Sequence, residues 1–350
     1  TSSDIDLATG NHFINTLSAN TTYTISDAGD VQAFQLEVTG ASSGFDLVDF
    51  TNTNKDKNIG AEESTPTGVT FKNDGTIMYI CGTGSSKVFS YALSTAWDVS
   101  TAGATTGNFS FSSQRLNIQD IFMKPDGTSL FMAAKSTAAI FKYNMSTPWD
   151  LSTMSYANVS FDTTGQQNSL SSLTFNSDGT RMFIGGNNGD KVDSYTLATA
   201  WGINSGTHVG SSNLDGSIGD ANGIQLNPDG TRLFITDDNG TDSITSFDLS
   251  TAWDLSTYNS KVEKFTVDTA VEGLSFSSDG LFVYIIGNAT DRVRQYSTKV
   301  PFTITWPSSI EWAGGVAPAA PAHGETDVFT IATDDSGTSY VGVKTADNLS

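Results

Sequence analysis

The stretch FDLSTAWDLST, residues 247–257, decides the fold because most of it occurs three more times in the same chain. The related stretches are YALSTAWDVST, YNMSTPWDLST and YTLATAWGINS. A strict period in a side chain as large as tryptophan is typical of a repeat protein whose units stack or surround an axis. The period is 52 residues, and its markers are Trp97, Trp149, Trp201 and Trp253.

A second repeated element shows where each unit begins. It reads FKNDGTIMYICG in its first copy and FSSDGLFVYIIG in its fifth, with Asp-Gly always ahead of an apolar run. Asp-Gly favours a tight hairpin turn because glycine tolerates a positive φ. The five copies predict five units, whose turns are marked by Asp74, Asp126, Asp178, Asp229 and Asp279.

Each unit predicts four antiparallel strands. An alternating strand precedes the Asp-Gly turn, two apolar strands follow it, and a fourth strand comes after the tryptophan turn. Units of about 50 residues with four strands are typical of propeller blades, whereas solenoids use a helix or a shorter unit. The fifth unit lacks the tryptophan turn and the fourth strand, so we expect residues 45–52 (FDLVDFTN) to supply its outer strand and close the ring.

The two ends of the chain contain further short strands that cannot form a core alone. Ring closure brings the ends of a propeller together, and neighbouring ends tolerate insertion into another domain. The sequence therefore predicts an all-β protein in which a five-bladed β-propeller is inserted into a small β-sandwich-like domain. The predicted parts are 1–42 and 300–350 for the sandwich and 43–299 for the propeller.

Composition restricts the partners. The chain has 17 basic and 38 acidic residues, a formal net charge of −21, which argues against nucleic acid or anionic lipid as a partner. No segment reaches the ~18 apolar residues of a membrane helix, so no membrane insertion is expected. A single cysteine, Cys81, excludes an intrachain disulfide, and its apolar surroundings predict a buried hydrophobe rather than a nucleophile.

The repeats resemble the YVTN-type propellers found in structural proteins of tailed bacteriophages, particularly marine ones. The flanks are similar to the β domain that recurs in the tail fibres and fibre-like virion proteins of those phages. The resemblance implies a virion component on an extracellular particle, with other virion proteins as partners. Such proteins usually form symmetric homo-oligomers, often trimers. Its most specific motif is carried by Trp306, Pro307, Trp312, Gly314, Gly315, Ala317 and Pro318.

We expect the Asp-Gly and tryptophan turns on one face of the propeller, and the variable loops on the other. Variable loops on a rigid scaffold suit recognition. Three acidic residues are predicted to lie just before first strands and therefore around the mouth of the central channel: Asp120, Asp220 and Glu272. The full candidate ligand-binding set on this face is Asp120, Asp190, Asp220, Asp237, Asp238, Asp242, Glu272 and Asp291.

Several alternatives stay open. Residues 236–242 (TDDNGTD) have oxygen ligands of a Ca²⁺ loop but lack the distal glutamate, which favours a solvated turn. The four tryptophans could form sugar platforms, although identical repetition favours packing between blades. The three histidines lack metal spacing, so no metal site is predicted.

The sequence predicts a non-enzymatic virion protein without a cofactor. Its propeller would project towards a host-surface glycan or protein. The alternatives are a purely structural head or tail decoration protein and a secreted carbohydrate-active propeller enzyme. A glycosidase needs two carboxylates at a defined separation. Blades one and three offer only Thr67-Gly68 and Ser171-Ser172 at the channel positions, so no such pair is evident.

Overall fold

A computed structural model describes most of the 350-residue chain. Strands dominate, and the described helices are single 3-10 turns of three residues each. None of them has the length or apolar character to cross a membrane. The described residues are 2–7, 12–17, 20–26, 33–39, 42–47, 50–111, 117–187, 191–214, 218–238, 242–265, 270–298, 300–321, 325–333 and 339–349.

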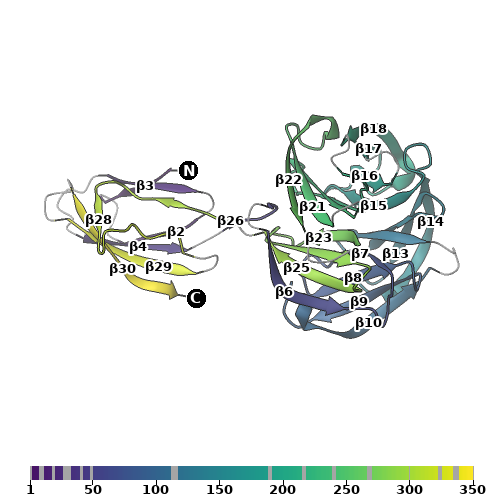
Figure 1. The fold of residues 1–350 in the computed structure, drawn as a ribbon, viewed down its shortest axis with the longest axis horizontal. Coiled ribbons are helices and arrows are strands. Elements are labelled where there is room, and N and C mark those ends of the chain that lie inside the picture. The colour runs from purple at the N-terminus through teal and green to yellow at the C-terminus, as the bar shows by residue number, and fades with distance from the viewer. Residues whose placement is uncertain are drawn as a thin grey trace. The chain divides into compact units, whose positions relative to one another are not determined.

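The chain divides into two compact units. One unit combines Thr1–Gly44 with Lys299–Ser350, and the other is Phe45–Thr298 (Figure 1). The limits predicted from the sequence, 42/43 and 299/300, differ from these by no more than two residues.

The second unit is a five-bladed β-propeller, as predicted (Figure 1). Blade one runs outward from β7 (Pro66–Phe71) through β8 (Ile77–Gly82) and β9 (Lys87–Leu93) to β10 (Ala102–Ser110), all antiparallel. The other four blades repeat this order from the inner to the outer strand. Blade two contains β11 (Ile118–Met123), β12 (Ser129–Ala134), β13 (Ala139–Met145) and β14 (Met154–Asp162), and blade three contains β15 (Leu170–Phe175), β16 (Arg181–Gly186), β17 (Lys191–Leu197) and β18 (Gly206–Asn213). Blade four contains β19 (Gly223–Leu226), β20 (Arg232–Asp237), β21 (Ser243–Leu249) and β22 (Tyr258–Phe265), and blade five contains β23 (Val271–Phe276), β24 (Phe282–Gly287), β25 (Arg292–Ser297) and β6 (Thr51–Asn58).

The fifth blade corrects one prediction. Its outer strand is β6, which pairs antiparallel with β25, so the strand comes from the predicted side of the chain but begins at Thr51 instead of residue 45. Residues 45–47 belong to the fifth turn. The Phe45 backbone N–H donates to Gly280 O at 2.8 Å, as Trp97 N–H donates to Gly75 O at 3.0 Å.

Phe45 therefore occupies the tryptophan position of the fifth blade, with a positive φ of 54° against 64° for Trp97. Leu47 is fully buried two residues later, as Val99 is after Trp97. The alternating apolar residues of 45–50 suggested a strand, whereas Phe45 and Leu47 belong to this turn. The strand itself, TNTNKDKN, is polar because an outer strand faces water along most of its length.

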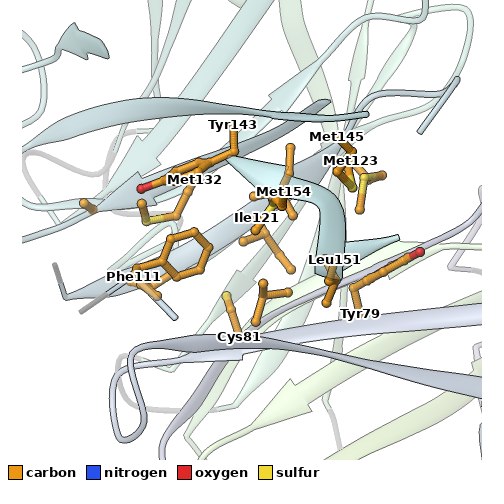
Figure 2. Packing of buried hydrophobic residues seen from close by; sticks show 14 residues of the cluster. Tyr79, Cys81, Phe111, Ile121, Met123, Met132, Tyr143, Met145, Leu151 and Met154 are labelled. Carbon is orange, nitrogen blue, oxygen red and sulfur yellow. The ribbon is translucent and has the colours of Figure 1, made fainter. Parts of the chain in front are cut away.

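Apolar side chains fill the space between neighbouring blades. Figure 2 shows Tyr79 and Cys81 of blade one facing Ile121 and Leu151 of blade two. Cys81 is free and fully buried, and burial raises the pKa of its thiol well above the usual value. The thiol is therefore protonated and packs as a small hydrophobe, as the sequence suggested.

The inner strands are also joined around the ring by polar side chains. Thr67 Oγ1 donates to Ile118 O at 3.0 Å, and Ser172 Oγ donates to Ala221 O at 3.1 Å. At the closure, a Cβ added to Gly273 would lie 2.6 Å from Thr67 O. Only a glycine allows β23 and β7 to approach this closely, so the ring is closed backbone against backbone.

The first unit is a two-sheet sandwich. A three-stranded sheet contains β1 (Ser2–Asp6), β3 (Thr21–Ser26) and β27 (Ile304–Thr305). A five-stranded sheet has the order β2 (His12–Thr16), β4 (Ala33–Thr39), β29 (Thr326–Ala332), β30 (Tyr340–Leu349) and β28 (Ile310–Trp312). A short pair, β5 (Ser42–Ser43) with β26 (Val300–Pro301), joins the two chain segments where they meet.

The two tryptophans of the C-terminal motif belong to the core of this sandwich. The Trp306 ring stacks on Tyr23 with centroids 5.3 Å apart and meets Trp312 edge-on at 4.8 Å. Trp306 Nε1 donates to Pro318 O at 2.7 Å, which satisfies the indole and anchors the irregular segment that follows. Both chain ends contribute to this core, so the sandwich needs both of them.

Candidate functional site

The propeller presents two faces that differ in their construction. We define the turn face by the Asp-Gly hairpins and tryptophan turns, and the loop face by the second-to-third-strand loops and the blade-to-blade connections. Contacts within each face support the division. The Trp97 indole lies against Gly75 on the turn face, and Thr83 N–H donates to Thr65 O at 3.0 Å on the loop face.

The Asp-Gly turns of blades one to four repeat one design on the turn face. Asp74 Oδ1 accepts hydrogen bonds from Thr76 N at 3.0 Å and Thr76 Oγ1 at 2.6 Å, and the same pattern recurs at Asp126, Asp178 and Asp229. Partial burial of Asp74 opposes ionisation, but bonds from Lys72 and Thr76 outweigh it and lower its pKa to about 2. These carboxylates are satisfied turn caps.

The tryptophans of the turn face pack between blades. Trp201 stacks on Phe131 of blade two, with centroids 6.1 Å apart, and Trp253 stacks on Phe183 of blade three at 6.0 Å. Tyr79 Oη donates to Trp149 O at 2.7 Å. Each of these contacts joins a tryptophan turn to the preceding blade. The structure therefore assigns the tryptophans to scaffolding between blades.

Asp120 does not stand at the channel mouth, where the sequence suggested it. It lies inside β11, and its side chain is buried in the channel wall against Gly68. Its Oδ1 accepts from Ile121 N at 2.8 Å, and its Oδ2 accepts from Leu173 N at 3.0 Å. Burial raises the pKa of Asp120 to about 8 despite these two bonds. Asp120 joins blades two and three and is not exposed to a ligand on the loop face.

Three other candidate acids hold loop backbones. Asp237 is buried and accepts from Gly219 N at 2.8 Å and Asp220 N at 3.2 Å. Asp242 accepts from Val271 N at 3.2 Å, and the backbone carbonyl of Asp291 accepts from Ile59 N at 2.9 Å. Asp190 lies outside the described residues.

The remaining candidates, Asp220, Asp238 and Glu272, are brought together at the mouth of the channel. Burial is the largest effect on Glu272, followed by the charge of Asp238, and they raise its pKa to about 7. Lys135 and Asn288 oppose this shift, and Asp220 adds to it. Asn288 Nδ2 donates to Glu272 Oε1 at 2.6 Å. The Glu272 carboxyl is therefore partly protonated near neutral pH.

Sequence reasoning missed Lys135 and the asparagines of this cluster. Asn222 Nδ2 donates to Asp238 Oδ1 at 2.8 Å and so orients that carboxylate. A signal for Asn222 was present in the sequence, because the residue four positions before the end of every inner strand is polar. These residues are Thr67, Gln119, Ser171, Asn222 and Glu272.

Buried polar side chains hold the described parts of two loops on the loop face, although the sequences of these loops differ. In blade one the Glu63 carboxylate, 1% exposed, accepts from Thr65 N at 3.0 Å, Gly84 N at 2.8 Å and Ser85 N at 3.0 Å. In blade three Gln167 occupies the corresponding place and donates to Lys191 O at 3.2 Å. The loops are thus held by different residues in different blades.

No metal-binding arrangement is found in the described part of the chain, where no group of three His, Cys, Asp or Glu side chains could hold an ion. Residues 239–241, inside the segment considered for Ca²⁺, lie outside that part. His12 pairs with Glu37 at 2.8 Å in the sandwich, and His208 contacts Asp193 at 3.1 Å in blade three. His323 is not among the described residues.

Comparison with known proteins yields no family model and no curated sequence that matches this chain. Among solved structures, a Bacteroides uniformis protein described provisionally as a 6-phosphogluconolactonase is 14% identical, covers 67% of each chain and has a TM-score of 0.42. The periplasmic gluconolactonase of Pseudomonas aeruginosa is 13% identical over 75% of this chain and 72% of its own, with a TM-score of 0.41. The β-propeller domain of Cps50 from Myceliophteria thermophila is 11% identical over 66% and 82%, with a TM-score of 0.42.

Proposed function

We propose that this chain is a non-enzymatic structural protein of a tailed-phage virion whose propeller presents its loop face to a host surface. The observation that carries the recognition role is the contrast between the two faces. The turn face uses nearly the same residues in every blade, whereas the loops differ in sequence, and their described parts are held by buried groups such as Glu63 and Asp237. A non-repeating set of loops on a repeated scaffold suits recognition of one partner.

The positions of the carboxylates support a binding role over a catalytic one. Hydrolysis of a glycosidic bond needs two carboxyl groups that can reach a substrate. Asp120, Asp237 and Asp242 use their oxygens on backbone amides of the protein itself. Asp238 and Glu272 are each held by an asparagine amide. The mouth cluster therefore offers acceptors for hydroxyl or amino groups of a ligand.

The virion assignment rests on the resemblance of the repeats and flanks to phage fibre proteins. In this proposal the sandwich unit connects the chain to other virion proteins, and the protein assembles as a homo-oligomer on the extracellular particle. The host-surface partner is a glycan or a protein. The alternative of a decoration protein without a receptor is separated from this proposal by a binding measurement.

The test uses fluorescently labelled full-length protein and a panel of bacterial cells. We expect saturable binding to at least one strain, reduced at least tenfold by the combined changes Asp220→Asn, Asp238→Asn and Glu272→Gln. The matched control removes three charges from the turn face through Asp74→Asn, Asp126→Asn and Asp178→Asn, which keeps an acceptor oxygen in each turn. Equal binding of both triple variants would reject the loop face as the receptor surface, and release of sugar from host polysaccharide would reject the non-enzymatic role.

A further inference from the structure

The turn face encloses a cavity of about 340 Å³ at the centre of the ring. Its walls include the last two residues of every inner strand. The terminal residues are apolar in all five blades and pack between blades. The residues before them differ in chemistry: Thr70, Phe122, Thr174, Gln225 and Ser275.

This second set of five also lines a smaller cavity of about 60 Å³ deeper in the channel, so it forms the floor of the central cavity. Phe122 is the one aromatic member; its ring packs on Trp201 and Phe175, with centroids 6.1 and 5.0 Å away, and remains partly exposed. Within the described part of the chain, the hydroxyls of Thr70, Thr174 and Ser275 have no hydrogen-bond partner. Gln225 uses only its Oε1, which accepts from Phe276 N at 3.0 Å.

The cavity is uncharged although the protein is strongly acidic. The described residues that line it carry no ionisable side chain. Asp120 lies beyond the floor, and burial keeps its pKa near 8, so at neutral pH it is mostly a neutral carboxylic acid. A ligand with a formal charge would therefore lose its hydration without gaining a counter-charge.

We propose that this cavity binds one uncharged hexopyranose ring, stacked on Phe122 and hydrogen-bonded by Thr70, Thr174, Gln225 and Ser275. A pyranose has an apolar C–H face that suits the negative face of an aromatic ring, and hydroxyls around its edge that suit unpaired hydroxyl and amide groups. Pockets of this volume, with apolar walls and a few convergent polar groups, are typical of small-ligand sites.

This site is separate from the receptor surface proposed above, because it opens on the opposite face of the propeller. Because the turn face repeats similar residues in every blade, the sequence alone gives no indication of this site. The distinguishing residue is Phe122, which stands where blades one and three have threonine. A substitution at this position can therefore restore the pattern of those blades without adding a group foreign to the ring.

Binding is measured by titrating full-length protein with methyl glucoside, methyl galactoside, methyl mannoside and N-acetylglucosamine. The signal is tryptophan fluorescence, because Trp97 and Trp253 line the cavity. Glucuronic acid and glucosamine are the charged controls. We expect at least one neutral sugar to saturate with a Kd on the order of 1 mM, as befits a single small ring. Both charged sugars should bind at least tenfold more weakly.

Phe122→Thr should weaken the saturating sugar at least tenfold, and Thr174→Val about threefold to tenfold, because the latter removes one neutral hydrogen bond. Phe122→Leu keeps an apolar floor and tests the ring itself if Phe122→Thr fails to fold. Phe141→Thr is the matched control, since it makes the same change in blade two away from the cavity.

The proposal is overturned if none of the neutral sugars saturates, if Phe122→Leu binds as the wild type does, or if charged sugars bind equally well. Stronger binding of N-acetylleucinamide than of any sugar would assign the cavity to a partner's side chain and would also overturn it. None of these outcomes bears on cell binding through the loop face, so the two proposals fail independently.

Discussion

The turn face and the loop face of the propeller hold the connections between strands in opposite ways. On the turn face, one glycine and one aromatic ring meet in every blade, and the backbone of both residues is left-handed: φ is +71° at Gly179 and +63° at Trp201. On the loop face, Glu63 in blade one and Gln167 in blade three hold loops of different sequence. Repeated local geometry builds the scaffold, and individual buried polar groups allow the other surface to vary.

The strongest way to break this comparison is Gly179→Ala. A Cβ there would lie 2.2 Å from the Trp201 ring in a left-handed backbone. The change should lower the free energy of unfolding by about 2–5 kcal/mol, because it adds backbone strain and overpacking. Urea denaturation followed by circular dichroism measures it.

The matched control for Gly179→Ala is Gly315→Ala in the sandwich. Gly315 has a similar φ of +75° but nothing within 4 Å of an added Cβ. Only the backbone cost of about 1–2 kcal/mol is expected there. Equal losses in the two variants would show that contact with the tryptophan is not what requires glycine on the turn face.

Phe45→Ala tests whether the fifth turn really belongs to the same design. The partly exposed ring packs against Phe276 with centroids 5.2 Å apart and covers Gly280. Its loss should cost about 2–3 kcal/mol, less than for a fully buried phenylalanine. Phe45→Trp should stay within about 1 kcal/mol of wild type, since four blades carry tryptophan at this place. If the urea midpoint of Phe45→Ala equals that of the wild type, Phe45 does not fill the tryptophan position of blade five.

Glu272→Gln tests a buried acid of the loop face through the pH dependence of the protein's stability. The folded-state pKa of Glu272 is raised from 4.5 to about 7, chiefly by burial and next by Asp238. The folded state therefore binds more protons than the unfolded state between about pH 4.5 and 7, and this group's contribution to stability falls as pH rises through that window. In the glutamine variant this loss of stability with rising pH should be absent. Across the window, the change in the free energy of unfolding should differ between the two proteins by about 1–2 kcal/mol, a value reduced to allow for the partial exposure of Glu272.

Urea denaturation at several pH values between 4 and 8 measures the Glu272→Gln effect. Glu311→Gln, which removes an exposed carboxylate of the sandwich, is the matched control for the loss of one carboxylate. Parallel profiles for wild type and Glu272→Gln would mean that the acid is not buried in a cluster as the structure has it.

The smallest effect is expected at the exposed tips of the loop face. Thr137→Ala, in the loop between β12 and β13, should change the free energy of unfolding by less than about 0.5 kcal/mol. Thr180→Ala, the corresponding exchange in a turn, removes the 2.6 Å bond to Asp178 and should cost about 1 kcal/mol. Thermal denaturation of the two variants side by side decides whether the turn is the more sensitive face.

Much of the fold followed from local patterns. The Asp-Gly turns, the tryptophan spacing and the apolar strands predicted five blades, because hairpins and period-two strands depend on neighbouring residues. The polar strand Thr51–Asn58 carries no such pattern, so the outer strand of blade five was placed six residues too early. The resemblance between FDLVDF and the WDLST turns was visible in the sequence, but phenylalanine in place of tryptophan concealed it.

The candidate site was predicted less well, for a physical reason. A carboxylate in a loop looks the same in the sequence whether it faces water or binds a backbone amide. Asp120 and Asp237 turned out to be buried acceptors, whereas Asp220, Asp238 and Glu272 come together with Lys135 of another blade. That grouping depends on the curvature of the ring, which no stretch of fewer than two blades contains.

The sequence by itself determined the number of blades, their turns and the aromatic positions between them, because these arise from short-range geometry repeated every 50 to 52 residues. Only the tertiary structure decided which polar groups remain available. Closing the ring buries Asp120 in the wall, gathers the acids at one mouth, and leaves Phe122 with three unpaired hydroxyls at the centre of the other face. Burial and hydrogen-bond pairing are properties of the assembled ring, and they separate a functional side chain from a structural one of the same type.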